Sequence, residues 1–145
     1  MKTLPVLLFV SAASLLPAAP PAISDAPVKN FVLKVFTKEG PLSLSVRGSA
    51  ARYLGPDLIE ITDMNITTFI TEPAMPTRPE MSLLSPEAYF LPNSNKARGN
   101  KSVRIIRDDL EAWGTKWTYD QKEKRISLDQ KVRVVFHAEL KDILK

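Results

Sequence analysis

The stretch Leu42-Ser43-Leu44-Ser45-Val46-Arg47 decides the fold, because its apolar and polar side chains alternate without a break. Successive side chains of a β-strand point to opposite faces, so a period of two is typical of a strand with one buried and one solvated face. Four further segments show the same alternation, at 31–35, 59–61, 103–105 and 132–136. The sequence therefore predicts a set of antiparallel strands.

Turn-forming residues separate these segments. The chain contains 12 prolines and five glycines, which leave little room for long helices. Four short segments predict tight connections between strands, at 38–41, 54–57, 91–95 and 120–124. Only 108–113 and 138–145 are candidates for helix, and the first is too short to form a stable one. The predicted fold class is all-β.

A weak internal repeat supports a fold of stacked hairpins. Its three copies begin at Ala51, Ala88 and Trp117, with an aromatic residue two positions later and an Asp or Asn twelve positions later. A regular antiparallel meander with evenly spaced turns would look self-similar in the same way. Stacked hairpins leave two open edges and a trough lined by one face of every strand, and an open edge can accept a partner's strand.

The first 22 residues are predicted to be a secretory signal peptide. Lys2 precedes an uncharged apolar run from Leu4 to Leu16, and small residues and prolines follow it. A membrane anchor is the alternative, although a spanning helix needs roughly 20 apolar residues. Residues 23–30 would then be a linker, residues 31–138 the folded domain and residues 139–145 a C-terminal tail.

Composition narrows the classes of function. Of the 145 residues, 44% are hydrophobic and 25% charged, which is typical of a globular domain. The absence of cysteine excludes disulfides, thiolate metal sites and cysteine nucleophiles. The formal net charge of +4 is modest and acidic side chains are scattered among the basic ones, which does not favour nucleic acid as a partner.

An enzyme is not predicted. His137 is the only histidine, and a surface or packing role fits it better than catalysis. The sequence contains no nucleophile elbow and no glycine-rich phosphate loop. The adjacent carboxylates Asp108 and Asp109 would diverge on a strand, so a turn or metal role for them is conjecture. We therefore predict no catalytic residue, no metal and no cofactor.

Several segments resemble the LptC family, a component of the lipopolysaccharide-export bridge. The segment from Phe31 to Gly40 and the segment Val46-Arg47-Gly48-Ser49-Ala50-Ala51-Arg52-Tyr53 resemble the start of that family's periplasmic domain. Later repeats of LptC and its OstA-like relatives are similar to 85–90, 97–99, 103–105 and 113–120. The resemblance covers Phe31 to about Phe136, and it depends on glycine, alanine and aromatic positions.

This resemblance implies an open, twisted antiparallel β-jellyroll built of stacked hairpins. It also implies that the protein receives lipopolysaccharide from the inner-membrane lipopolysaccharide-export ABC transporter complex and passes it to a periplasmic bridge protein of the same fold. Familiar members keep an N-terminal membrane helix, whereas this N-terminus resembles a cleavable signal. The soluble LptA-type bridge protein is therefore a rival assignment. The expected location is the periplasm, with an inner-membrane tether if the N-terminal segment is retained.

A lipid carrier needs an apolar trough for acyl chains, and the inward positions of the predicted strands would supply one. These positions are Val46, Tyr53, Ile61, Ile66, Phe90, Val103, Ile105, Trp117, Tyr119, Val134 and Phe136. Plain core packing is the simpler interpretation of each. The first and last strands are the predicted edges for partners, through Phe31, Leu33, Val35, Val132, Val134 and Phe136. Phosphates could meet four arginines, or these could simply face solvent: Arg98, Arg104, Arg107 and Arg133.

Two other classes of function remain open at this point. One is an exported β-sandwich that joins partners through its edge strands and carries no lipid. The other is an oligonucleotide-binding barrel, which would need aromatic platforms beside basic residues. Trp113 and Trp117 lie near Lys116 in the sequence, so this third interpretation stays open. Salt-sensitive binding to single-stranded nucleic acid would have to be shown to support it.

Overall fold

A computed structural model describes residues 26–137, which form seven β-strands. The strands are β1 (Val28–Phe36), β2 (Leu42–Gly55), β3 (Leu58–Ile70), β4 (Arg78–Leu91), β5 (Lys96–Arg107), β6 (Leu110–Asp120) and β7 (Arg125–Phe136). Within this range there is no helix, and so none that could cross a membrane. The predicted signal peptide and the C-terminal helix candidate lie outside the described residues.

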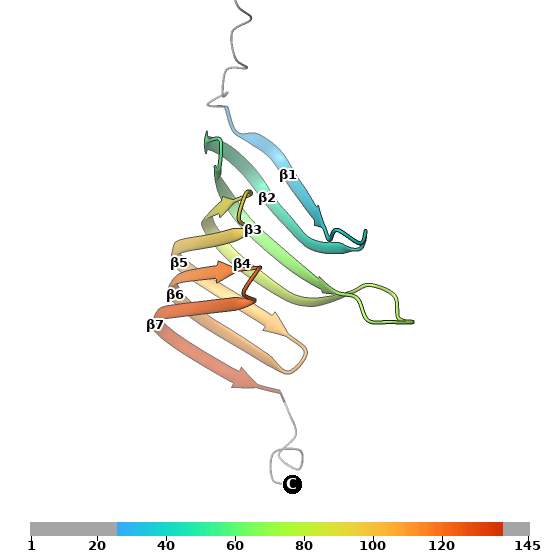
Figure 1. Cartoon of the computed structure of the whole chain (residues 1–145). Coiled ribbons are helices and arrows are strands. Elements are labelled where there is room, and N and C mark those ends of the chain that lie inside the picture. The colour runs from blue at the N-terminus through green and yellow to red at the C-terminus, as the bar shows by residue number, and fades with distance from the viewer. Residues whose placement is uncertain (1–25, 138–145) are drawn as a thin grey trace, which may run out of the picture.

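All seven strands belong to one antiparallel sheet, in which each strand pairs with its neighbours in sequence. The sheet is strongly twisted and curled, and it ends in two free edges, β1 and β7 (Figure 1). The prediction of an open all-β fold of sequential hairpins is confirmed. The four predicted connections all fall between strands.

Two connections were not predicted. The longer joins β3 to β4 through residues 71–77, where Pro73 and Pro76 interrupt strand pairing. The shorter is Asp108-Asp109, a two-residue turn between β5 and β6. The helix candidate over 108–113 is therefore wrong. Short polar residues such as Asp tolerate the backbone conformations of tight turns, and the apolar residues that follow begin β6.

The alternation in the sequence becomes rows of side chains across the sheet. One row runs through every strand in register, from Leu33 on β1 to Val134 on β7. Its members are Leu33, Val46, Ile66, Leu83, Ile105, Ala112 and Val134. Because every member is apolar, the concave face of the sheet has a continuous hydrophobic lining.

The strands bend at mid-length, which allows this one sheet to enclose a core. The ladder between β4 and β5 shifts between Leu84 and Tyr89, where Pro86 could not have supplied an N–H. Ser85 fills part of this gap, because its hydroxyl donates to the carbonyl oxygen of Ser102 at 2.8 Å. Comparable shifts interrupt the β5–β6 and β6–β7 ladders. A bulge bends its strand and increases the local twist.

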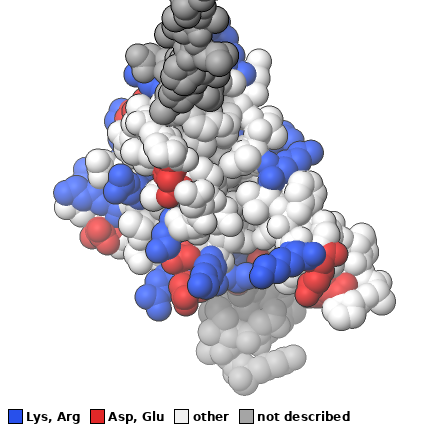
Figure 2. All heavy atoms as spheres, turned by 45° about the horizontal axis from the view of Figure 1, so that its top comes forward, with Lys and Arg blue, Asp and Glu red and all other residues white. Residues whose placement is uncertain are grey.

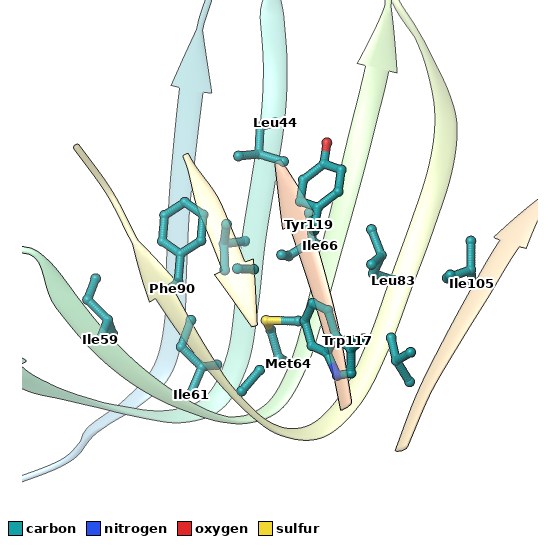
Figure 3. Close-up of a cluster of buried hydrophobic side chains, with 14 of the residues drawn as sticks. Leu44, Ile59, Ile61, Met64, Ile66, Leu83, Phe90, Ile105, Trp117 and Tyr119 are labelled. Carbon is teal, nitrogen blue, oxygen red and sulfur yellow. The ribbon is translucent and has the colours of Figure 1, made fainter. Parts of the chain in front are cut away.

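The centre of the curled sheet is a solid core. Trp117 and Tyr119 on β6 project towards Met64 and Ile66 on β3 (Figure 3). The largest of these side chains, Trp117, is 1% exposed and lies over Gly99 on the paired strand. A Cβ at position 99 would lie 2.5 Å from Trp117 Nε1, so only glycine fits beneath the indole.

A hydrogen bond joins two distant parts of the sheet across the concave face. Gln121, in the turn between β6 and β7, donates from Nε2 to Ser43 Oγ on β2 at 3.0 Å. The same side chain accepts a short hydrogen bond from the Tyr119 hydroxyl through Oε1. The β6–β7 hairpin is therefore fixed against β2, 78 residues away in the sequence.

Candidate functional site: an apolar cavity beside strand β7

A cavity of about 370 Å³ lies at the C-terminal part of the sheet. One wall comes from β3–β6 near the β3–β4 and β5–β6 connections, and the opposite wall comes from the β6–β7 hairpin. Most of the lining is apolar: Met81, Ile105, Leu110, Ala112, Tyr119, Ile126, Leu128 and Val134. The polar and charged lining residues are Thr68, Glu80, Arg107, Gln121 and Lys124.

The cavity forms here because β7 is an edge strand and a small side chain lies next to it. Ala112 on β6 pairs with Val134 on β7, and the short Ala112 side chain leaves space in the apolar row. No other strand within residues 26–137 covers β7, and Val134 is 43% exposed although its partner in the row is buried. The cavity consequently opens to solvent at the edge of the sheet.

Two polar residues of the hairpin wall, Tyr119 and Gln121, form a chain of hydrogen bonds. Tyr119 donates to Gln121, and Gln121 donates to Ser43. Burial raises the pKa of the Tyr119 phenol, and the carboxylates of Glu80 and Asp120 raise it further. The phenol is therefore neutral at physiological pH and acts as a hydrogen-bond donor.

The lining of the cavity includes charged residues and one buried threonine. Arg107 Nε forms an ion pair with Asp109 Oδ1 at 3.3 Å, whereas the Lys124 ammonium has no ion pair with any residue between 26 and 137. Thr68 is 4% exposed, and its Oγ1 has no hydrogen-bond partner among the described residues. The arrangement suits an elongated apolar ligand with a polar end.

The eleven positions predicted to line a trough fall into three groups. Ile105, Tyr119 and Val134 line the cavity. Six others are at most 1% exposed in the core and do not line the cavity: Val46, Ile61, Ile66, Phe90, Val103 and Trp117. These six residues pack in the hydrophobic core.

Tyr53 and Phe136 form the third group: neither lines the cavity and both are exposed, so their role in a trough stays a prediction. Tyr53 is 42% exposed because the pairing of β1 with β2 ends at Val28 and Ala51, so β1 does not extend beside it. Its ring contacts the ring of Phe31 edge-on, at 6.4 Å between ring centroids. Phe136 is 66% exposed because it ends the edge strand β7.

Among the described residues, no strand pairs with the outer side of either predicted edge. On β1, Phe31 is buried and Leu33 and Val35 are half-buried. On β7, Val132, Val134 and Phe136 are all exposed. Lysine and arginine side chains flank the apolar residues on both strands, with Lys29 and Lys34 on β1 and Lys131 and Arg133 on β7.

Three of the four arginines considered for phosphate contact lie on the convex face, away from the cavity. The guanidinium groups of Arg104 and Arg133 lie over the Trp113 ring, at 5.9 and 5.3 Å from its centroid. Arg104 also pairs with Glu111 at 3.0 Å. Arg98 lies over Tyr89. Basic and acidic groups are interspersed on the face seen in Figure 2. Arg107 is the arginine that reaches the cavity.

Most residues of the cavity were not predicted from the sequence. Ile126 and Leu128 alternate with polar neighbours at the start of β7, and this alternation could have identified them. Ala112 and Thr68 carry no such signal, because a small or hydroxyl side chain is equally common on either face of a strand. Within residues 26–137, no group of three or more His, Asp or Glu side chains could hold a metal ion.

Comparison with protein families agrees with this geometry. The family model described as "Lipopolysaccharide-assembly, LptC-related" matches residues 20–137, which include all seven strands. The chain belongs to the LptC-related family. The resemblance seen in the sequence is thereby confirmed, and the family has a role in lipopolysaccharide assembly. No curated protein matches the sequence at a significant level.

Proposed function

We propose that this LptC-related protein binds lipopolysaccharide by its acyl chains and transfers it within the lipopolysaccharide-export machinery. The observation that carries the proposal is the apolar cavity beside β7, which is open to solvent at a free edge of the sheet. The lipid would come from the inner-membrane ABC transporter complex and continue to a periplasmic bridge protein of the same fold. The site of action would be the periplasm, reached through the N-terminal signal.

The size and lining of the cavity agree with one acyl chain. If a methylene group occupies about as much space as a water molecule, roughly 30 Å³, the cavity accommodates on the order of ten methylenes. Burial of a methylene contributes about 0.8 kcal/mol, so a chain of that length gains at most about 8 kcal/mol. Such a gain is enough for binding without specific polar contacts, and the remaining acyl chains would lie outside the cavity.

The free edges supply a route for transfer. A partner sheet that adds its strand to β7 would continue the backbone ladder and would lie beside the opening of the cavity. The exposed Val132 and Val134 would become buried in such a joint. A second partner could add to β1 at the other end of the sheet. Pairing at β7 would thus extend the apolar lining from one protein to the next.

Site-specific photocrosslinking tests the proposal. A photoreactive amino acid at Val134, which lines the cavity and tolerates a larger side chain because it is half-exposed, should crosslink to lipopolysaccharide in cells. The matched control is Val135, the next residue, which pairs with Glu111 and points to the convex face. Equal crosslinking at the two positions, or none at Val134, would contradict a lipid site in the cavity.

The second candidate function is an interaction module that carries no lipid. It is favoured by the solid core, which occupies most of the trough predicted from the sequence, and by the two free edges. Mass spectrometry of the protein purified from a host that makes lipopolysaccharide separates the two candidate functions. Retained lipopolysaccharide supports the carrier, and a lipid-free preparation that still captures a bridge protein supports the module.

A further inference from the structure

The cationic side chains of the two edge strands have no ionic partner. Within residues 26–137, the lysine and arginine side chains that pair with carboxylates all belong to β4 or β5. No lysine or arginine of an edge strand has such a partner in this part of the chain: Lys29, Lys34, Arg125, Lys131 and Arg133. The sheet itself therefore does not compensate the charges of its edges.

The two edges have the same sign of charge. Strand β1 contains two lysines and no acidic residue, and β7 contains two arginines, one lysine and one aspartate, so each strand has a net charge of +2. These charges accompany exposed apolar side chains, among them Phe36 on β1 and Val132 on β7. An exposed apolar edge can pair with another sheet, and charged side chains, lysine above all, are a common means of preventing wrong pairing.

A joint between two copies of this chain would bring like charges together. Strands β1 and β7 lie at opposite ends of the sheet (Figure 1), so a joint of β7 with β1 could repeat from copy to copy. Like charges on directly opposite residues of paired strands are destabilising. A joint of β7 with a second β7 would suffer the same repulsion. The edge charges therefore disfavour both kinds of joint between copies.

Arg133 has a defined place on the β7 edge. It pairs with Trp113 on β6, and its guanidinium lies over the indole at 5.3 Å from the ring centroid. A guanidinium that lies over a ring keeps N–H donors in its plane, and these match a carboxylate in a bidentate contact. A strand added to β7 would place a side chain with its Cβ about 5 Å from that of Arg133 on the same face. A carboxylate on that side chain would supply the missing ionic partner.

We infer that β7 selects a partner strand with acidic side chains beside Lys131 and Arg133 and rejects a second copy of this chain. The inference rests on the proposed pairing of β7 during transfer and adds the chemistry of the partner. Backbone hydrogen bonds and burial of Val132 and Val134 would stabilise a joint with almost any strand. Charge supplies the specificity that the backbone ladder lacks, because it favours one partner and opposes the other.

Reversal of the charge on one edge of the full chain tests this inference. K131E/R133E changes the net charge of β7 from +2 to −2 and leaves β1 cationic, and K29E/K34E makes the equivalent change on β1 alone. Each variant then has one edge of either sign, so a second copy provides the oppositely charged strand. Sedimentation velocity at low ionic strength should show both variants self-associating at least about tenfold more tightly than the wild type.

Two controls separate edge pairing from other causes of association. In K29E/K34E/K131E/R133E both edges are acidic, so this variant should again resist self-association. K38E/K122E makes the same change in total charge as either two-residue variant, but in the turns between β1 and β2 and between β6 and β7, and should behave as the wild type. Association of the variants with one acidic edge should also weaken as salt is raised, because exposed charges are screened.

Three results would overturn the inference. They are wild-type self-association as tight as that of the variants with one acidic edge, no association of either of those variants, and equal association of the variant with two acidic edges. None of these measurements involves lipid. The inference can therefore fail while the crosslink at Val134 still supports a carrier, and a missing crosslink would leave the selectivity of the edges unchanged.

Discussion

The centre of the sheet and its β7 end are built from the same alternating strands, yet one is solid and the other hollow. In the centre, Trp117, Phe90 and Ile61 come from three different strands and are almost completely buried. At the β7 end, Ile105, Leu128 and Val134 surround a cavity. The difference lies in side-chain size and in the presence of covering strands, since Ala112 is the smallest member of its row and β7 has no outer neighbour among the described strands.

Because of this difference, we expect the centre to determine the stability of the fold and the β7 end to determine the proposed binding of a ligand. The centre supplies the buried apolar area that holds the fold together, because it is packed from both sides. The β7 end contributes less to stability and leaves apolar surface available to a ligand. Substitutions in the two regions should therefore have distinct effects, and the following four range from the largest expected loss of stability to the smallest.

Replacement of Trp117 by alanine should have the largest effect. The indole is fully buried in the centre, so W117A should lower the free energy of unfolding by about 3–5 kcal/mol. The matched control is W113A on the convex face, where loss of the contacts with Arg104 and Arg133 should cost about 1 kcal/mol. Chemical denaturation measures both. Similar losses for the two variants would show that the centre is not the main source of stability.

A methyl group added at Gly99 should be the next most damaging change. Its Cβ would lie 2.5 Å from Trp117 Nε1, so the indole must move and G99A should cost about 1–3 kcal/mol. Gly55 provides the control, because a Cβ there meets nothing within 4 Å. The same unfolding experiment compares them. If G99A and G55A unfold alike, the indole is not held as tightly as its burial indicates.

Tyr119 lies where the two regions meet and should give a pH-dependent effect. Its raised folded-state pKa means that folding favours the neutral phenol, whereas in the unfolded chain the phenol titrates near pH 10. This contribution to stability is complete below about pH 10 and declines as the pH rises above it. Y119F should lose that decline and, through the bond to Gln121, about 1 kcal/mol at neutral pH.

Urea denaturation between about pH 7 and pH 11 tests this prediction, because the unfolded phenol titrates within that range. Y89F is the control, since Tyr89 lies on the convex face beside Arg98. If the free energy of unfolding declines equally above pH 10 in Y119F and Y89F, other titrating groups cause the decline.

Filling the cavity should affect stability least and lipid binding most. Phenylalanine at Ala112 would occupy space that is open to solvent, so A112F should change the free energy of unfolding by about 1 kcal/mol or less. The amount of lipid retained on purification, measured by mass spectrometry, should fall strongly. T118F, on the convex face of the same strand, should retain lipid as the wild type does. Unchanged lipid in A112F would place the lipid elsewhere.

The sequence predicted the strands well because alternation and turn residues are local signals. It did not separate the solid centre from the cavity, since Ile66 and Ile105 give the same apolar signal in a strand. What separates them is their distance from the free edge and the size of the side chains opposite, which depend on the complete sheet. Strand β4 and the start of β6 were also not recognised. The prolines of β4 disfavour a strand, and the turn at Asp108-Asp109 carries no strong turn signal, so both are identified only from their pairing with neighbouring strands.

The pairing of every strand with its neighbours in sequence has a consequence for assembly. Such a sheet can grow in the order in which the chain is synthesised, one hairpin at a time, and low sequence separation between partners favours rapid folding. The hydrogen bond from Gln121 to Ser43 and the pairing of β7 come last in that order. The cavity beside β7 is therefore completed only in the final step, because its hairpin wall is the last part of the sheet to pair.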